Sequence, residues 1–208
     1  SNYTFAITCF SCKLHIDLIN FKLRHICVFS IKKLMKSKEN IVFLGMMGSG
    51  KSSVGFLVSK KLNFEFNDTD KIIENELKLT IAEIFKIKGE NFFREMEEKI
   101  TLKILKKKKT IISLGGGAFV NKNIREEILK NHYSFWLKWN SSTLIKRIIN
   151  STKRPIAFNS SKKELKNLIK KRSNIYSKAL FKINCEQLSK NEIVNKVINI
   201  YKDDKVIS

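Results

Sequence analysis

The segment from Gly45 to Ser52, Gly-Met-Met-Gly-Ser-Gly-Lys-Ser, combines closely spaced glycines with a lysine and a hydroxyl side chain. Glycine lets the backbone turn so that several N–H groups converge on one point, where they can cradle phosphate oxygens. In such a loop we expect Lys51 to reach the β- and γ-phosphates of a nucleotide and the Ser52 hydroxyl to ligate Mg²⁺. The pattern therefore predicts a P-loop that binds the phosphates of ATP.

The segments on either side of this loop fit that role. Residues 41–44, Ile-Val-Phe-Leu, have the length and β-branching of a buried strand, and 52–62 has apolar residues at helical spacing. A helix that starts near Lys51 adds the positive end of its dipole to the phosphate site. The glycines alone also fit a plain tight turn, but the order strand, loop, helix argues against it. The residues expected to contact ATP here are Gly48, Ser49, Gly50, Lys51, Ser52 and Ser53.

Short apolar strands alternate with helical patterns along the rest of the chain. Strands are expected near 64–67, 110–114, 133–137 and 181–184, and helices over 70–77, 81–107, 123–130, 142–150, 164–177 and 191–201. Alternation of this kind is typical of right-handed βαβ units, which place parallel strands in one sheet and helices on both faces. The prediction is a three-layer α/β fold around a central parallel sheet of roughly five strands.

A pair of carboxylates, in Asp68-Thr69-Asp70, follows the second predicted strand. Ligands of open α/β sheets gather at this edge. If the segment is extended, side chains two residues apart point the same way, so one carboxylate can act on the water shell of a metal and the other on a substrate hydroxyl. The alternative for Asp70 is that it caps the helix expected to start near Lys71.

Further motifs follow in a fixed order. Phe93-Arg94 lies within Gly-Glu-Asn-Phe-Phe-Arg-Glu-Met-Glu, a triple glycine occupies 115–117, and Arg154-Pro155 stands in a polar stretch. Together with the P-loop and the paired aspartates, this series resembles the shikimate kinase family over about residues 39–202. Ser113, where many P-loop proteins have an aspartate, also fits that family.

The resemblance implies a reaction and a set of catalytic residues. The γ-phosphoryl group of ATP would pass to the 3-hydroxyl of shikimate, giving ADP and 3-phosphoshikimate in the biosynthesis of chorismate and aromatic amino acids. Lys51, Asp70 and Arg154 would be catalytic, with Asp70 as the base and Arg154 on a lid near 150–162. Mg²⁺ would be held by Ser52 and Asp68. Arg147 and Arg154 would complete the ATP site, with Arg147 against adenine.

The same resemblance implies how the acceptor would be bound. Arg94 and Arg172 would clamp the carboxylate of shikimate, since a guanidinium fork matches a planar anion. Glu97, one helical turn after Arg94, would orient its guanidinium. The remaining residues expected to line the substrate pocket are Asp70, Gly115, Gly116, Gly117, Phe85 and Phe93.

Several alternatives remain open from the residues alone. Arg147 and Arg172 lie in lysine-rich helices and also fit solvated surface bases, and both phenylalanines also fit the core. Another small-molecule kinase, such as a gluconate kinase, shares the loop and the fold. A net charge of +22 would suit an RNA-binding P-loop protein, but no recognition module is visible. A non-catalytic relative is disfavoured because every expected catalytic residue is present.

Residues 1–38 differ from the rest, with one acid and no clear periodicity. We expect this extension to be disordered or non-native, with an organellar targeting peptide as the minor alternative, and residues 39–208 to form the kinase-like domain. Cys9 and Cys12 lack the second pair of ligands that a zinc module has. The expected partners are ATP and shikimate, with no nucleic acid and no membrane. We expect a cytoplasmic monomer.

Overall fold

The computed structural model describes residues 38, 40–150 and 161–207. Their strands form one five-stranded, fully parallel sheet with the order β2-β3-β1-β4-β5, as the alternating pattern predicts. The strands are β1 (Ile41–Leu44), β2 (Glu65–Asp68), β3 (Thr110–Ser113), β4 (Tyr133–Lys138) and β5 (Phe181–Asn184). The helices are α2 (Lys51–Leu62), α3 (Thr69–Leu77), α4 (Ile81–Leu105), η1 (Ala118–Val120), α5 (Lys122–Asn131), α6 (Ser141–Ile149), α8 (Lys162–Tyr176) and α9 (Lys190–Ile207).

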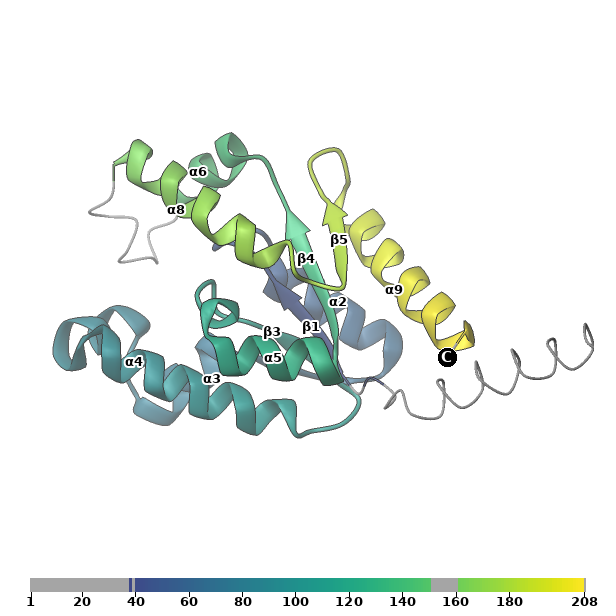
Figure 1. Ribbon diagram of the computed structural model, residues 1–208, viewed down its shortest axis with the longest axis horizontal. Helices are drawn as coiled ribbons and strands as arrows, with labels where there is room; N and C mark the ends of the chain where they lie inside the picture. The colour runs from purple at the N-terminus through teal and green to yellow at the C-terminus, as the bar shows by residue number, and fades with distance from the viewer. Residues whose placement is uncertain (1–37, 39, 151–160, 208) are drawn as a thin grey trace, which may run out of the picture. The chain divides into compact units, whose positions relative to one another are not determined.

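Helices cover both faces of the sheet, which makes three layers (Figure 1). Side chains alternate along β1, so Ile41 and Phe43 face one layer while Val42 and Leu44 face the other. The first pair packs with α2 and α9, and the second with α3, α4, α5 and α8. Because both faces of the sheet are covered, the central strand β1 is a continuous apolar run and not an alternating one.

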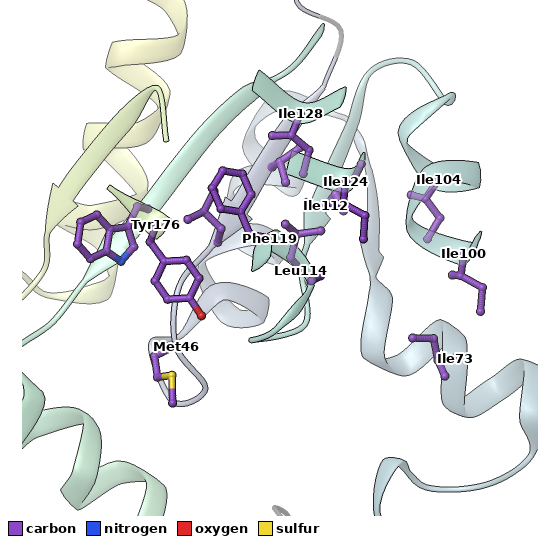
Figure 2. Packing of buried hydrophobic residues seen from close by; sticks show 14 of the residues in the cluster. Met46, Ile73, Ile100, Ile104, Ile112, Leu114, Phe119, Ile124, Ile128 and Tyr176 are labelled. Carbon is purple, nitrogen blue, oxygen red and sulfur yellow. The ribbon is translucent and has the colours of Figure 1, made fainter. Parts of the chain in front are cut away.

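The larger of the two cores lies under α4, α5 and α8. Figure 2 shows Ile112 and Leu114 packed with Ile124 and Ile128 of α5, and Tyr176 with its hydroxyl turned toward Met46. These side chains are almost completely buried. Dense packing of this kind holds neighbouring backbone segments at fixed separations, including the loops that leave the strands.

The segments that contain the candidate site residues follow the carboxyl ends of three adjacent strands. The P-loop follows β1, the triple glycine follows β3, and Asp68 ends β2. The strand order β2-β3-β1 puts the triple-glycine loop between the other two segments. The topology thus brings together residues that are far apart in the sequence, at the edge where open α/β sheets bind ligands.

Helix α4 is interrupted, although its periodicity predicts one continuous helix over 81–107. Gly89 has φ 82° and ψ 168°, a conformation essentially limited to glycine, so two helical segments meet there at a kink. The expectation of an unbroken helix was therefore wrong. A capping box between Thr80 and Glu83 fixes the start of the first segment.

Two predicted regions fall outside the described residues. Of the N-terminal extension, only Lys38 is described, and it donates a hydrogen bond to the Leu129 carbonyl. Residues 151–160 of the predicted lid, including Arg154, are also outside the described residues. The division into an extension and a kinase-like domain stays a prediction. Among the helices of the described part, none is both long and apolar enough to cross a membrane.

Asn40, directly before β1, links the end of α4 to the start of β3. Its fully buried side chain donates to the carbonyls of Leu105 and Lys107 and accepts from the Thr110 N–H. We expect Asn40→Ala to lower the free energy of unfolding by roughly 2–4 kcal/mol, because several buried backbone groups lose their partner. Urea denaturation measures this. Asn199→Ala, at an exposed position on α9, should stay within about 0.5 kcal/mol of the parent, and an equal effect in both variants would contradict the assignment.

Candidate active site

The P-loop has the backbone that its glycines predict. Gly48 and Gly50 have φ 80° and 87°, in the left-handed region that favours glycine, and Gly50 immediately precedes α2. The buried Lys51 turns back over the loop, where its ammonium group donates to the carbonyls of Gly45 and Met46 at 3.0 and 3.1 Å. The loop therefore carries a fixed cation beside the N-terminus of a helix, which is an arrangement suited to phosphate.

Two hydroxyl groups meet at the start of α2. Ser52 Oγ lies 3.3 Å from Ser113 Oγ at the end of β3, so the serine that replaces the common aspartate contacts the P-loop serine directly. Ser52 and Ser53 also line a second cavity of about 480 Å³ beside Phe56 and Phe66. Ser52, Asp68 and Lys71 therefore line both this cavity and the larger one described below.

The paired aspartates are not both in extended backbone, so that expectation was wrong. Asp68 ends β2 and caps α3 by accepting from the Lys71 N–H at 3.4 Å, while Asp70 lies in the first turn of the helix. The alternative that Asp70 is the cap is also wrong, because Asp68 takes that place. Both carboxylates nevertheless line the same cavity, since the turn from strand to helix keeps them on one side.

Each glycine of the triple lies against a different part of the site. A Cβ on Gly115 would fall 2.5 Å from Asp70 Oδ1 and 2.6 Å from Glu97 Oε1, and one on Gly117 would fall 2.9 Å from Arg94 Cζ. A Cβ on Gly116 would lie 3.3 Å from the Met47 backbone nitrogen. A Cβ at 115 or 117 would displace these charged groups, so glycine there leaves them in their observed positions.

Two residues that sequence reasoning missed hold this loop in place. The fully buried Thr69 hydroxyl donates to the Ser113 carbonyl at 3.2 Å and accepts from the Gly115 N–H at 2.8 Å. The Tyr176 hydroxyl donates to the Gly116 carbonyl. Thr69 separates the two aspartates in sequence, which is a usable signal, whereas nothing in the sequence near Tyr176 indicates its partner.

Arg94 is held by two carboxylates and two rings. Its Nη1 donates to the buried Glu97 at 2.7 Å, and its other nitrogens donate to the exposed Glu90. The guanidinium carbon lies 5.1 Å from the ring centroid of Phe93 and 6.0 Å from that of Phe85. Glu97 therefore contacts Arg94 as expected, and the phenylalanines support the guanidinium as well as the core.

Most of the expected site residues line one cavity of about 790 Å³, enough for a substrate and part of a nucleotide. Those that the structure brings together there are Lys51, Ser52, Asp68, Asp70, Phe85, Phe93, Arg94, Glu97, Gly116, Gly117 and Arg172. Arg172 and Arg94 come from different helices, α8 and α4, so the cavity has guanidinium groups on two elements.

Of the expected nucleotide residues outside that cavity, Gly48 and Ser49 lie in the P-loop and Arg147 of α6 contacts it. The Ser49 carbonyl accepts from the indole N–H of Trp139 at 2.9 Å, and the Gly48 carbonyl accepts from Arg147 at 3.4 Å. Arg147 therefore stands beside the phosphate loop, although α6 begins more than ninety residues later in the chain. Trp139 was not expected from the sequence. Arg154 cannot be placed because it lies outside the described residues.

Burial and neighbouring charges raise the pKa values of two carboxylates in the cavity. Burial raises the pKa of Asp70 to about 6, the negative charges of Asp68, Glu97 and Glu74 add to this shift, and Lys51 opposes it. Burial also raises the pKa of Glu97 despite its pairing with Arg94. A carboxylate that titrates near neutral pH is suited to accept and release a proton.

The ionised form of Asp70 should lower the free energy of unfolding. Its pKa is raised from 3.8 to about 6 in the folded state, so the folded protein holds the proton more tightly and stability falls as the pH rises from about 4 through 6. We expect Asp70→Asn to raise the free energy of unfolding at pH 8 by about 1–3 kcal/mol, with the gain shrinking toward pH 4.

Urea denaturation at pH 4, 6 and 8 tests this expectation. Glu76→Gln is the matched control, because Glu76 is an exposed acid that pairs loosely with Lys103, at 3.9 Å, and it should show no comparable gain. A wild-type protein more stable than the Asp70→Asn variant at pH 8 would show that the carboxylate is stabilised, and not strained, by its surroundings.

The chain is similar to known proteins over most of its length. The family model "Shikimate kinase" matches residues 47–202. The shikimate kinase of Bartonella quintana (strain Toulouse) is 38% identical over 179 residues, which is 84% of this chain and 85% of that protein. Among solved structures, shikimate kinase from Acinetobacter baumannii in complex with shikimate matches with a TM-score of 0.76 at 27% identity, over 83% of this chain and 98% of that one.

A second solved structure, shikimate kinase from Aquifex aeolicus, matches with a TM-score of 0.72 at 30% identity and covers 80% of this chain and 98% of its own. The family match covers the P-loop from Met47 onward, the paired aspartates, the triple glycine and the arginine helices that line the cavity. The resemblance seen in the order of the motifs is thus confirmed: the chain belongs to the shikimate kinase family.

Proposed function

We propose that the 790 Å³ cavity is where this shikimate kinase passes the γ-phosphoryl group of ATP to the 3-hydroxyl of shikimate, with the residues that line it in defined roles. The observation that carries the assignment is one cavity with a P-loop lysine, a carboxylate of raised pKa and two arginines from separate helices. These are the groups needed to bind phosphate, take a proton and hold an anionic acceptor.

The acceptor carboxylate would lie between Arg94 and Arg172. Arg94 keeps its buried bond to Glu97 during binding, while its bond to the exposed Glu90 is weak enough to be exchanged for a substrate oxygen. The rings of Phe85 and Phe93 line the same space and offer an apolar wall to a carbon ring. This arrangement anchors the acid end of shikimate and leaves its hydroxyls toward α3.

Asp70 would act as the base for the attacking hydroxyl. As the oxygen of that hydroxyl forms its bond to the γ-phosphorus, the bond from phosphorus to the bridging oxygen breaks and the proton passes to the Asp70 carboxylate. With a pKa of about 6, Asp70 is mostly ionised at neutral pH yet still basic enough to accept the proton. ADP leaves with the bridging oxygen, and the acceptor carries the phosphoryl group as a phosphate ester.

Lys51 and the P-loop would neutralise the charge on the transferred group. The Lys51 ammonium now donates to the Gly45 and Met46 carbonyls, contacts that phosphate oxygens would replace or share. Charge spread over the phosphoryl oxygens is stabilised best by donors that are already in position. We propose Arg154 as a further cation on a lid, by family resemblance, and Arg147 as the contact to adenine.

The oxygen atoms beside the P-loop fit a hard divalent cation. The Ser52 and Ser113 hydroxyls are 3.3 Å apart and Asp68 lines the same cavity, so the donors are oxygen only, which is the set Mg²⁺ prefers. When bound with ATP, Mg²⁺ would neutralise phosphate charge. We propose Ser52 and Asp68 as the residues that hold it.

A coupled ADP-release assay with ATP and Mg²⁺ tests the proposal, with shikimate, gluconate or no acceptor. We expect release with shikimate only, and a fall of roughly 10²–10³-fold in kcat for Lys51→Ala because an oriented cation is lost. Lys60→Ala, an exposed lysine on the same helix, is the control and should keep full activity. Release with gluconate alone would discard the acceptor assignment, and full turnover by Lys51→Ala would discard the role of that lysine.

Arg94→Lys should separate binding from chemistry. A lysine supplies one point charge where the guanidinium supplies a planar fork, so we expect the KM for shikimate to rise roughly 10- to 100-fold while kcat changes less. Steady-state kinetics over a shikimate series measures both constants. Arg125→Lys is the matched control, because Arg125 binds backbone carbonyls of η1 outside the cavity. An unchanged KM for shikimate would place the carboxylate elsewhere.

A further inference from the structure

Trp139 lies where β4 ends and α6 begins, beside the phosphate loop. Its half-buried indole donates its N–H to the Ser49 carbonyl at 2.9 Å. The bond joins two segments ninety residues apart and fixes both the indole plane and one P-loop carbonyl. A tryptophan whose N–H is bonded at one edge presents its ring faces in a set orientation.

Arg147 covers one of those faces. The guanidinium carbon lies 3.7 Å from the centroid of the Trp139 ring, a distance that places the flat group over the ring and not at its edge. Arg147 also donates to the Gly48 carbonyl at 3.4 Å. The long and otherwise exposed side chain is therefore held by the indole on one side and by the P-loop at its tip.

The helix that carries Arg147 is itself fixed at its start. Glu186, from the loop after β5, accepts from the Asn140 N–H at 3.0 Å and from the Thr143 hydroxyl. This glutamate supplies the cap that the Asn140 side chain does not provide. Hydrogen bonds and ring contacts thus link α6, the indole and the P-loop, and together they set the orientation of the guanidinium.

We propose that Trp139 is a positioning residue of the nucleotide site, which holds the Arg147 guanidinium flat as a preformed platform for the adenine base. A guanidinium has two flat faces and the indole takes one, so a base stacks on the other. The inference rests on the proposed function, which puts adenine against Arg147. Ordering a long side chain before binding removes part of the entropy cost of binding, which corresponds to roughly 3- to 10-fold in affinity.

Two substitutions separate the ring from its N–H group. Trp139→Phe keeps an aromatic face but loses the bond to Ser49, whereas Trp139→Leu loses both. We expect calorimetric titration with ADP to give a dissociation constant roughly 3- to 10-fold higher for the Leu variant than for the Phe variant. In an Arg147→Ala background this difference between Leu and Phe should vanish, because the ring then has no guanidinium to support.

Inorganic tripolyphosphate serves as a probe that has phosphates but no base. Its affinity should be equal in the Phe and Leu variants, since both lack the N–H bond to the P-loop and only the ring differs. Lys138→Ala is the control, because Lys138 is an exposed neighbour whose ammonium group lies over Trp136, and it should leave the affinity for ADP unchanged. A thermal unfolding curve for each variant confirms that the fold is intact.

If Trp139→Leu does not fold, the proposal is tested by the tryptophan fluorescence of the wild-type protein with and without ADP. Only Trp136 and Trp139 contribute tryptophan fluorescence, so the change produced by saturating ADP should disappear in Trp139→Phe and in Arg147→Ala. A change that survives in both variants would overturn the proposal.

Three further results would also overturn it. These are equal affinity of the Phe and Leu variants for ADP, a Leu–Phe difference for ADP that persists without Arg147, and a Leu–Phe difference of the same size for tripolyphosphate. If Arg147→Ala leaves ADP affinity unchanged in a protein that still phosphorylates shikimate, the platform is refuted and the proposed function stands. If the wild-type protein binds no ADP, the proposed function itself fails.

Discussion

The close approach of the backbone at 115–117 to charged side chains is the constraint on which the rest of the site depends. Gly115 fills the space between Asp70 and Glu97, and Gly117 lies against the Arg94 guanidinium. One stretch of backbone therefore sets the spacing of Asp70, Glu97 and Arg94. Thr69 of α3 and Tyr176 of α8 each form a hydrogen bond with that stretch, so two separate helices hold its backbone in place.

This spacing concentrates negative charge in a partly dry cavity. Asp68, Asp70 and Glu97 come from two helices and a strand end, and burial raises the pKa of both Asp70 and Glu97. Lys51 and Arg94 offset part of that cost. A site that binds anions and accepts a proton needs carboxylates at positions where apolar side chains would make the fold more stable. Such a loss of stability in favour of function is common.

Much of the fold follows from patterns within the sequence. The P-loop, the five strands and most helix bounds are local features, since strand length, β-branching and apolar spacing are visible in short windows. The errors are at positions where local pattern and tertiary structure disagree. Gly89 breaks an otherwise helical run, and α3 begins directly after Asp68, two residues earlier than an extended segment through Asp70 would need.

The candidate site was predictable where motifs name the residue type, and not where a contact joins distant segments. Lys51, Asp70, Arg94 and Arg172 all line the cavity. Asn40, Tyr176 and Trp139 matter through partners between sixty and ninety residues away, and a single sequence carries no signal of such pairs. Their side chains are ordinary in type, so only the packed structure reveals what they hold.

The pairing of Ser52 with Ser113 has a consequence for how a metal would be retained. Neutral hydroxyls and one carboxylate supply little of the charge that a strongly hydrated ion requires, and in the described part of the chain no three acidic, histidine or cysteine side chains converge on a common point. On the proposed assignment the nucleotide carries its own cation in and out with every turnover. Chelators would then stop the chemistry while leaving the resting fold unchanged.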